Sequence, residues 1–122
     1  MPTNDQGGDI PTVNPDLKAV QKELIAYARE LDVAVGRAKS SAEVNAILDE
    51  INEVTARIVS VGRQLFTRQT EAISAASAEV LSQAGEAKKA VQEIEDVKTF
   101  IKEVGSFLAV VDRVVDMAKL VI

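Results

Sequence analysis

The sequence predicts an all-α fold in the form of an antiparallel helical bundle. The prediction rests on a long helical seam, on the lack of any proline after Pro15, and on a core made of aliphatic residues. Hydrophobic residues make up 47% of the chain but aromatic ones only 3%, so Val, Ile, Leu and Ala must fill the core. Those side chains suit the close packing of slender helices. At 122 residues, the chain is expected to form one helical domain over 14–122.

Residues 1–13 are expected to form a flexible tail, because they are rich in Gly, Pro, Asn, Asp and Thr. The first helix then starts at a recognisable signal. Asn14 provides a capping side chain, Pro15 takes the tolerated first position and Asp16 faces the positive end of the helix dipole. Its apolar seam steps by three and four residues: Leu17, Val20, Leu24, Tyr27, Leu31, Ala34 and Ala38. A short connection at 38–41 makes the next helix an antiparallel neighbour.

The second helix is expected to run from Ser40 to Ala84. Ser40 and Glu43 have capping-box spacing. Its seam repeats every 3.5 residues, the period of packed helices: Val44, Ile47, Ile51, Val54, Ile58, Val61 and Leu65. After Thr67 small Ala and Ser residues dominate, and Gly85 is the expected stop, just past the helix end.

The third helix is expected to run from Glu86 to the chain end. Its first half has a thin apolar stripe, whereas its second half is apolar on two faces. One face carries Val97, Ile101, Val104, Leu108, Val111, Val115, Ala118 and Ile122. The other carries Phe100, Phe107, Val110, Val114, Met117 and Val121. A helix with two apolar faces needs two neighbours.

These asymmetries favour an elongated three-helix bundle in which the second and third helices form a long hairpin. The second helix would span roughly 66 Å and the first roughly 37 Å. The half of the hairpin beyond the first helix would be a two-helix arm with few large apolar residues. The alternative is a compact up-down four-helix bundle, with breaks near 67–70 and 96–99 that Thr70 and Asp96 would cap.

Composition excludes several classes of function. The net charge of −5 argues against a nucleic-acid partner, since phosphate binding needs clustered, unneutralised Lys and Arg. The absence of histidine removes the commonest acid–base catalyst and metal ligand, and the absence of cysteine removes disulfides. No signal peptide and no transmembrane run of apolar residues is seen. A cytoplasmic location is therefore expected, with signal-independent secretion left open.

Charged residues offer few candidates for chemistry. The carboxylate pairs Glu50/Glu53, Glu93/Asp96 and Asp112/Asp116 each share a helix face. They are interpreted as solvated faces rather than metal sites, and no cofactor is expected. Arg57, Arg63 and Arg68 follow an acidic group; charge complementarity within the bundle, including a Glu53–Arg57 pair, is favoured over a site for an acidic partner.

Three classes of function remain. The favoured one is a non-catalytic assembly or interaction module, self-associating or binding a helical protein through the face of Phe100, Phe107, Val110, Val114, Met117 and Val121. The alternative is an amphipathic protein that opens its bundle onto a membrane or other hydrophobic surface, although few basic residues are available for anionic lipid. An enzyme would need a polar residue inside a seam, and Tyr27 is the one candidate. The chain is accordingly predicted not to be an enzyme.

Overall fold

A computed structural model describes residues 12–121 and contains four α-helices within them. They are α1 (Pro15–Arg37), α2 (Ser41–Gly62), α3 (Glu71–Gln92) and α4 (Val97–Lys119). The four-helix bundle, which was the alternative, is therefore the architecture of the chain, and the three-helix layout is wrong. The expected tail at 1–13 falls almost wholly outside the described residues; Thr12 and Val13 are exposed and lie outside the helices.

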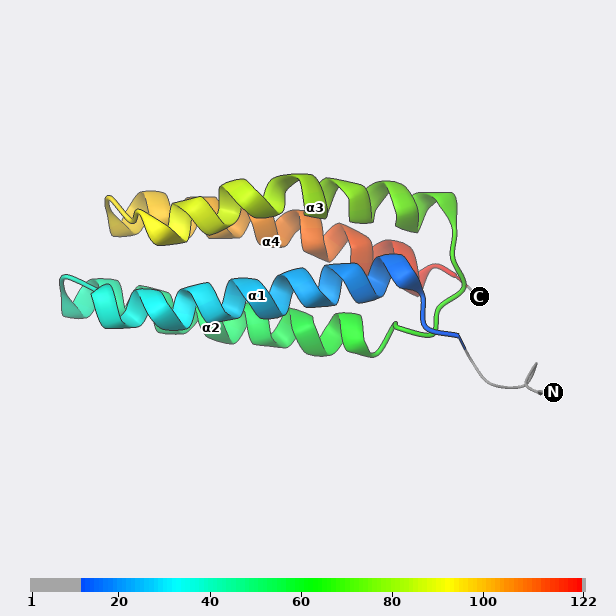
Figure 1. Cartoon of the computed structure of the whole chain (residues 1–122), viewed down its shortest axis with the longest axis horizontal. Helices are drawn as coiled ribbons and strands as arrows, with labels where there is room; N and C mark the ends of the chain where they lie inside the picture. The colour runs from blue at the N-terminus through cyan, green and yellow to red at the C-terminus, as the bar shows by residue number, and fades with distance from the viewer. Residues whose placement is uncertain (1–11, 122) are drawn as a thin grey trace.

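The bundle consists of two helical hairpins that lie side by side (Figure 1). Each hairpin pairs consecutive helices, α1 with α2 and α3 with α4, in antiparallel fashion. Between the hairpins, α1 contacts α3 and α2 contacts α4, and both of these pairs are parallel. Consequently α2 and α3 stand at diagonal corners, and the segment between them crosses one end of the bundle.

Each helix begins at a side chain that accepts hydrogen bonds from the first turn. Asn14 caps α1 and Ser40 caps α2, as the sequence predicts. Thr70 accepts from the amide of Ile73 to cap α3, and Asp96 accepts from the amide of Thr99 to cap α4. These caps satisfy amides that would otherwise lack partners at a helix start.

Two expected long helices are therefore interrupted, although neither break contains Gly or Pro. After Gly62 the chain forms turns closed by hydrogen bonds between residues three apart. The amide of Gln64 donates to the carbonyl of Val61, and the amide of Thr67 donates to the carbonyl of Gln64. Gly85, the expected stop, lies exposed inside α3. At about 1.5 Å per residue, the 22 residues of α2 span roughly 33 Å, half the expected length.

Burial explains why the compact form is preferred. The stretch expected to form a poorly covered arm is α3, and one face of it, which carries its large apolar residues and some of its small ones, is buried against α1 and α4. A separate arm would leave much of that apolar surface in water, whereas folding back removes it from water. The buried residues of α3 are Ile73, Ala76, Ser77, Val80, Ala84, Ala87 and Val91.

Candidate interaction surface

The six residues predicted to form the interaction face belong mainly to the interior of the bundle. Phe100, Phe107, Val110 and Val114 are at most 7% exposed, and Met117 and Val121 are partly buried against the same core. The helix has two neighbours within the chain, α2 and α3, whereas the three-helix layout would have given it the first and second helices.

Tyr27 covers part of this face. Its ring packs against that of Phe107 with a centroid distance of 4.9 Å and an interplanar angle of 50°. Tilted aromatic pairs of this kind stabilise beyond the area that they bury. Self-association through this face stays a prediction, and in the closed bundle Met117 and Val121 are its partly exposed members.

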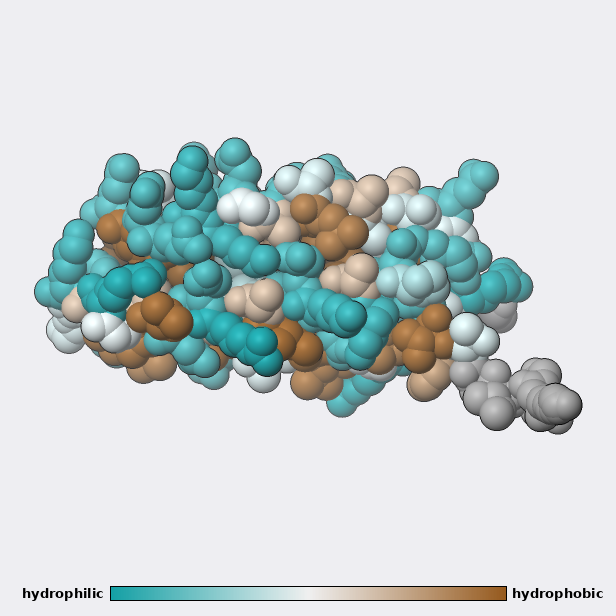
Figure 2. Space-filling view, in the orientation of Figure 1, coloured by the Kyte–Doolittle hydropathy of each residue, from teal (hydrophilic) through white to brown (hydrophobic). Residues whose placement is uncertain are grey.

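The side of the bundle between α2 and α4 is the least closely packed of its four sides. In the view of Figure 1, α1 and α3 lie in front, so this side faces away. The face that is visible, made by α1 and α3, is mostly hydrophilic with separate apolar patches (Figure 2).

An open groove of about 540 Å³ lies between α2 and α4. We call it the α2–α4 groove. Its wall on α2 is polar, and its wall on α4 is made of apolar and small residues and ends at a carboxylate. The lining residues are Asp49, Glu50, Asn52, Glu53 and Arg57 from α2, and Ile101, Gly105, Leu108, Ala109 and Asp112 from α4.

Arg57 ties the two walls together at one end of the groove. Its Nε and Nη2 atoms donate to the two carboxylate oxygens of Asp112, at 3.0 and 3.1 Å. Its Nη1 atom also donates to Glu53 at 2.8 Å, one turn earlier on α2. Charge complementarity within the bundle, the favoured interpretation of Arg57, is what this geometry shows. This bidentate pair needs the planar guanidinium of Arg, because a Lys ammonium cannot donate to both carboxylate oxygens in the same fixed geometry.

The rest of the groove carries uncompensated negative charge. Asp49 and Glu50 have no basic partner within ion-pair distance in the described part of the chain. Burial raises the pKa of Glu50, and the nearby carboxylates of Glu53 and Asp49 raise it further, against the opposing effect of Arg57. With four carboxylates and one guanidinium, the lining has a formal charge of −3.

The wall on α4 leaves room for close approach. Gly105 is exposed, and a Cβ atom built on it would meet nothing within 4 Å. Ala109 follows one turn later, and Ile101, one turn before, is 47% exposed. A side chain from outside could therefore contact apolar atoms and helix backbone together at this wall.

Tyr27 does not form a reactive site. The side chain is buried and its hydroxyl has no hydrogen-bond partner among the described residues. Burial raises its pKa well above the ordinary value, and the carboxylates of Glu50 and Glu103 add to the shift. The hydroxyl is therefore protonated at neutral pH and is closed off from any substrate.

Comparisons with known proteins give no relative: no family model, no curated protein and no solved structure matches the chain. Within residues 12–121, no helix has the length and apolar character needed to cross a membrane, and no cluster of acidic side chains is arranged to hold a metal ion.

Part of the groove can be predicted from the sequence, but its assembly cannot. Glu50 and Arg57 are three residues before and four residues after Glu53 on one helix, respectively, so helical spacing alone brings each of them near Glu53. The contact from Arg57 to Asp112 spans 55 positions and depends on α2 and α4 being neighbours. The spacing of Ile101 places it on one apolar face with Val104 and Leu108, but Ile101 is 47% exposed, and only the packing of α4 shows that it lines the groove.

Proposed function

We propose that this chain is a non-catalytic helical assembly module that works through surface contacts of a folded bundle and associates with itself. The observation that carries the proposal is the α2–α4 groove, where the exposed apolar atoms of Ile101 and Ala109 lie beside unneutralised carboxylates. Apolar surface rimmed by polar groups is typical of protein interaction sites.

The chemistry of the chain also supports a role without catalysis. The sequence has no histidine and no cysteine, which removes the side chains most often used as bases and nucleophiles near neutral pH. Tyr27, the one polar residue considered as a catalyst, is buried with a raised pKa. The chain is thus best understood as a rigid body with a recognition surface.

Sedimentation velocity over a wide range of protein concentration tests the proposal. We expect a mass above that of one chain, which increases with concentration. A single-chain mass at every concentration would show that the self-association is wrong. Flotation with phosphatidylcholine vesicles tests the alternative, in which the bundle opens onto a hydrophobic surface; binding of the vesicles would favour that alternative over assembly.

A further inference from the structure

Resting on the proposed function, we propose that the α2–α4 groove receives the outward face of α1 from a second copy of the chain. The outward face is defined by Lys18, Lys22, Ile25, Arg29 and Val33 and is called the α1 ridge below. The arrangement is head-to-tail, because each copy offers the ridge on one helix and the groove between two others.

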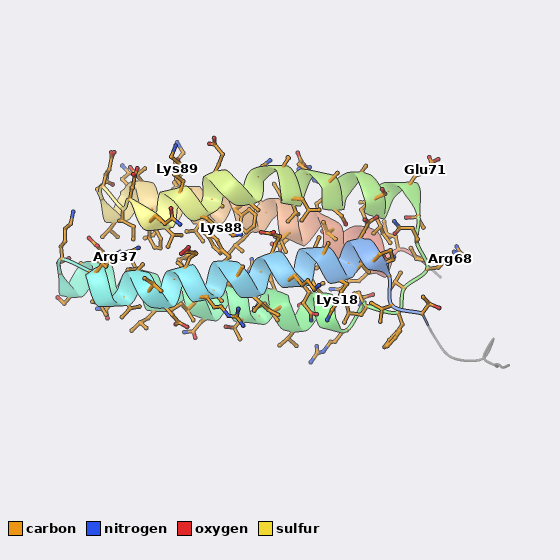
Figure 3. All side chains as sticks on the ribbon, in the orientation of Figure 1. Lys18, Arg37, Arg68, Glu71, Lys88 and Lys89 are labelled. Atoms are coloured by element: carbon orange, nitrogen blue, oxygen red, sulfur yellow. The ribbon has the colours of Figure 1, made fainter. Side chains whose placement is uncertain are left out.

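The α1 ridge has the charge that the groove lacks. All five of its residues are exposed, and three of them are basic. Of the acidic residues of α1, Glu23 pairs with Lys88 of α3 at 3.0 Å and Glu30 accepts a hydrogen bond from Gln92 of α3. Asp32 is exposed and lies one turn from Arg29, beside the ridge, so the ridge taken together with Asp32 has a formal charge of +2. In Figure 3, Lys88 lies on the side of α3 that faces α1, whereas Lys18 belongs to the ridge of α1.

The cations of the ridge are available to a partner. In residues 12–121, Lys18, Lys22 and Arg29 have no carboxylate within 4.0 Å. Opposite them, the groove has a formal charge of −3. Complementary charge of this kind guides encounter and fixes register between two surfaces. It also distinguishes a second copy from an acidic partner, which the groove would repel.

The spacing of apolar and basic residues matches as well. Lys22 and Arg29 are seven residues apart, which is about 10.5 Å along the helix, and Ile25 lies between them. The exposed apolar residues of the groove wall on α4 are Ile101 and Ala109, which are eight residues apart, about 12 Å along the helix. Ile25 can therefore contact the apolar wall of α4 while the flanking cations reach the carboxylates of α2, and the open space at Gly105 admits the ridge.

The position of the two surfaces determines the form of the assembly. The groove lies between α2 and α4, and α1 stands diagonally opposite α4, so the ridge and the groove face different directions. Such an interface is heterologous: after one contact forms, a ridge and a groove remain free. The assembly extends in this way until it closes as a ring or continues as a filament.

Two variants block one surface each. Gly105→Phe fills the groove at a helix position with open space around it, so the bundle tolerates the new ring. Lys22→Glu with Arg29→Glu reverses the charge of the ridge. The matched controls are Gly85→Phe, an exposed helix position on α3 with equally open space, and Lys39→Glu with Lys89→Glu, which gives the same net charge. Lys89 projects away from the bundle in Figure 3.

The experiment is sedimentation velocity of each variant and of the two blocked variants mixed in equal amounts. We expect each blocked variant alone to lose about tenfold or more in association affinity while the controls retain it. The mixture should form a dimer and stop, because only the ridge of the Gly105→Phe chain and the groove of the charge-reversed chain are intact. Circular dichroism checks that helicity is unchanged.

Other outcomes overturn the inference in distinguishable ways. If the unmodified chain assembles and both blocked variants assemble equally well, self-association stands but this interface is wrong. The interface is also wrong if the mixture continues past a dimer. If the unmodified chain sediments as a single chain throughout, the inference and the proposed self-association are both wrong.

Discussion

The backbone amide of Asn14 donates to the carbonyl oxygen of Leu65 across 2.7 Å, so α1 begins against the turns that follow α2. The side chain of Asn14 serves both segments. Its oxygen accepts from the amides of Asp16 and Leu17, and its nitrogen donates to the carbonyl of Thr67 at 3.1 Å and to the side chain of Gln69 at 2.9 Å. One buried residue thus caps a helix and holds the crossover between the hairpins.

Replacing Asn14 with Ala should reduce the free energy of unfolding by about 2 kcal/mol, because the cap is lost and buried partners lose their hydrogen bonds. Asn14→Ser is the informative control, since its hydroxyl can cap α1 but cannot reproduce both amide bonds to the crossover. We expect the free energy of unfolding of Asn14→Ser, measured with urea, to lie between those of the unmodified protein and Asn14→Ala. Equal stability of the Ser and Asn proteins would mean that the bonds to Thr67 and Gln69 contribute nothing.

Replacing Tyr27 with Phe should increase the free energy of unfolding by about 1 kcal/mol. The change removes a buried hydroxyl that has no partner among the described residues, and it retains the ring that packs on Phe107. Urea unfolding at neutral pH measures the effect, and Tyr27→Leu shows what loss of the aromatic pair does. A clear loss of stability in the Phe protein would show that the hydroxyl is hydrogen-bonded, for example to a buried water.

Replacing Glu50 with Gln should stabilise the fold at neutral pH. The folded-state pKa of Glu50 is raised, chiefly by burial, so its ionised form is less favourable in the folded chain than in the unfolded one. The resulting loss of stability is present above the folded pKa and disappears as the pH falls below the unfolded value. The difference between the variant and the unmodified protein should therefore shrink in acid. Glu86→Gln, at an exposed position of α3, is the control, and a pH-independent difference would contradict the argument.

Ionisation of Asp96 should stabilise the fold, whereas ionisation of Glu50 destabilises it. Hydrogen bonds from the amide and hydroxyl of Thr99 lower the pKa of this carboxyl, so its charged form is favoured in the folded state. Its stabilising effect is present above the unfolded pKa and is lost as the pH falls through the folded pKa. Asp96→Asn keeps an oxygen that can cap α4 but does not titrate. As the pH is lowered through the acid range, the midpoint temperature of unfolding should decrease less steeply for Asp96→Asn than for the unmodified protein. Parallel pH profiles of the two proteins would show that the protonation of Asp96 is not coupled to folding.

The helical class, the starts at Asn14 and Ser40 and the antiparallel first hairpin could be predicted because they depend on neighbouring residues. Thr70 and Asp96 were recognised as possible caps, but a cap alone does not end the preceding helix. The breaks arise because folding back buries one face of α3, including Ile73, Val80 and Val91, and this gain depends on contacts between residues far apart in the sequence. Likewise, the pair of Arg57 with Glu53 follows from helical spacing, whereas the groove follows from the choice of neighbours.

The crossover from α2 to α3 gives the molecule two unlike ends. Thr12, Val121 and the crossover lie at one end of the bundle, while the opposite end has only the short links 38–40 and 93–96 (Figure 1). A fluorescent label or tether attached to the side chain of either residue would therefore sit at the end that holds the crossover, far from the two short links.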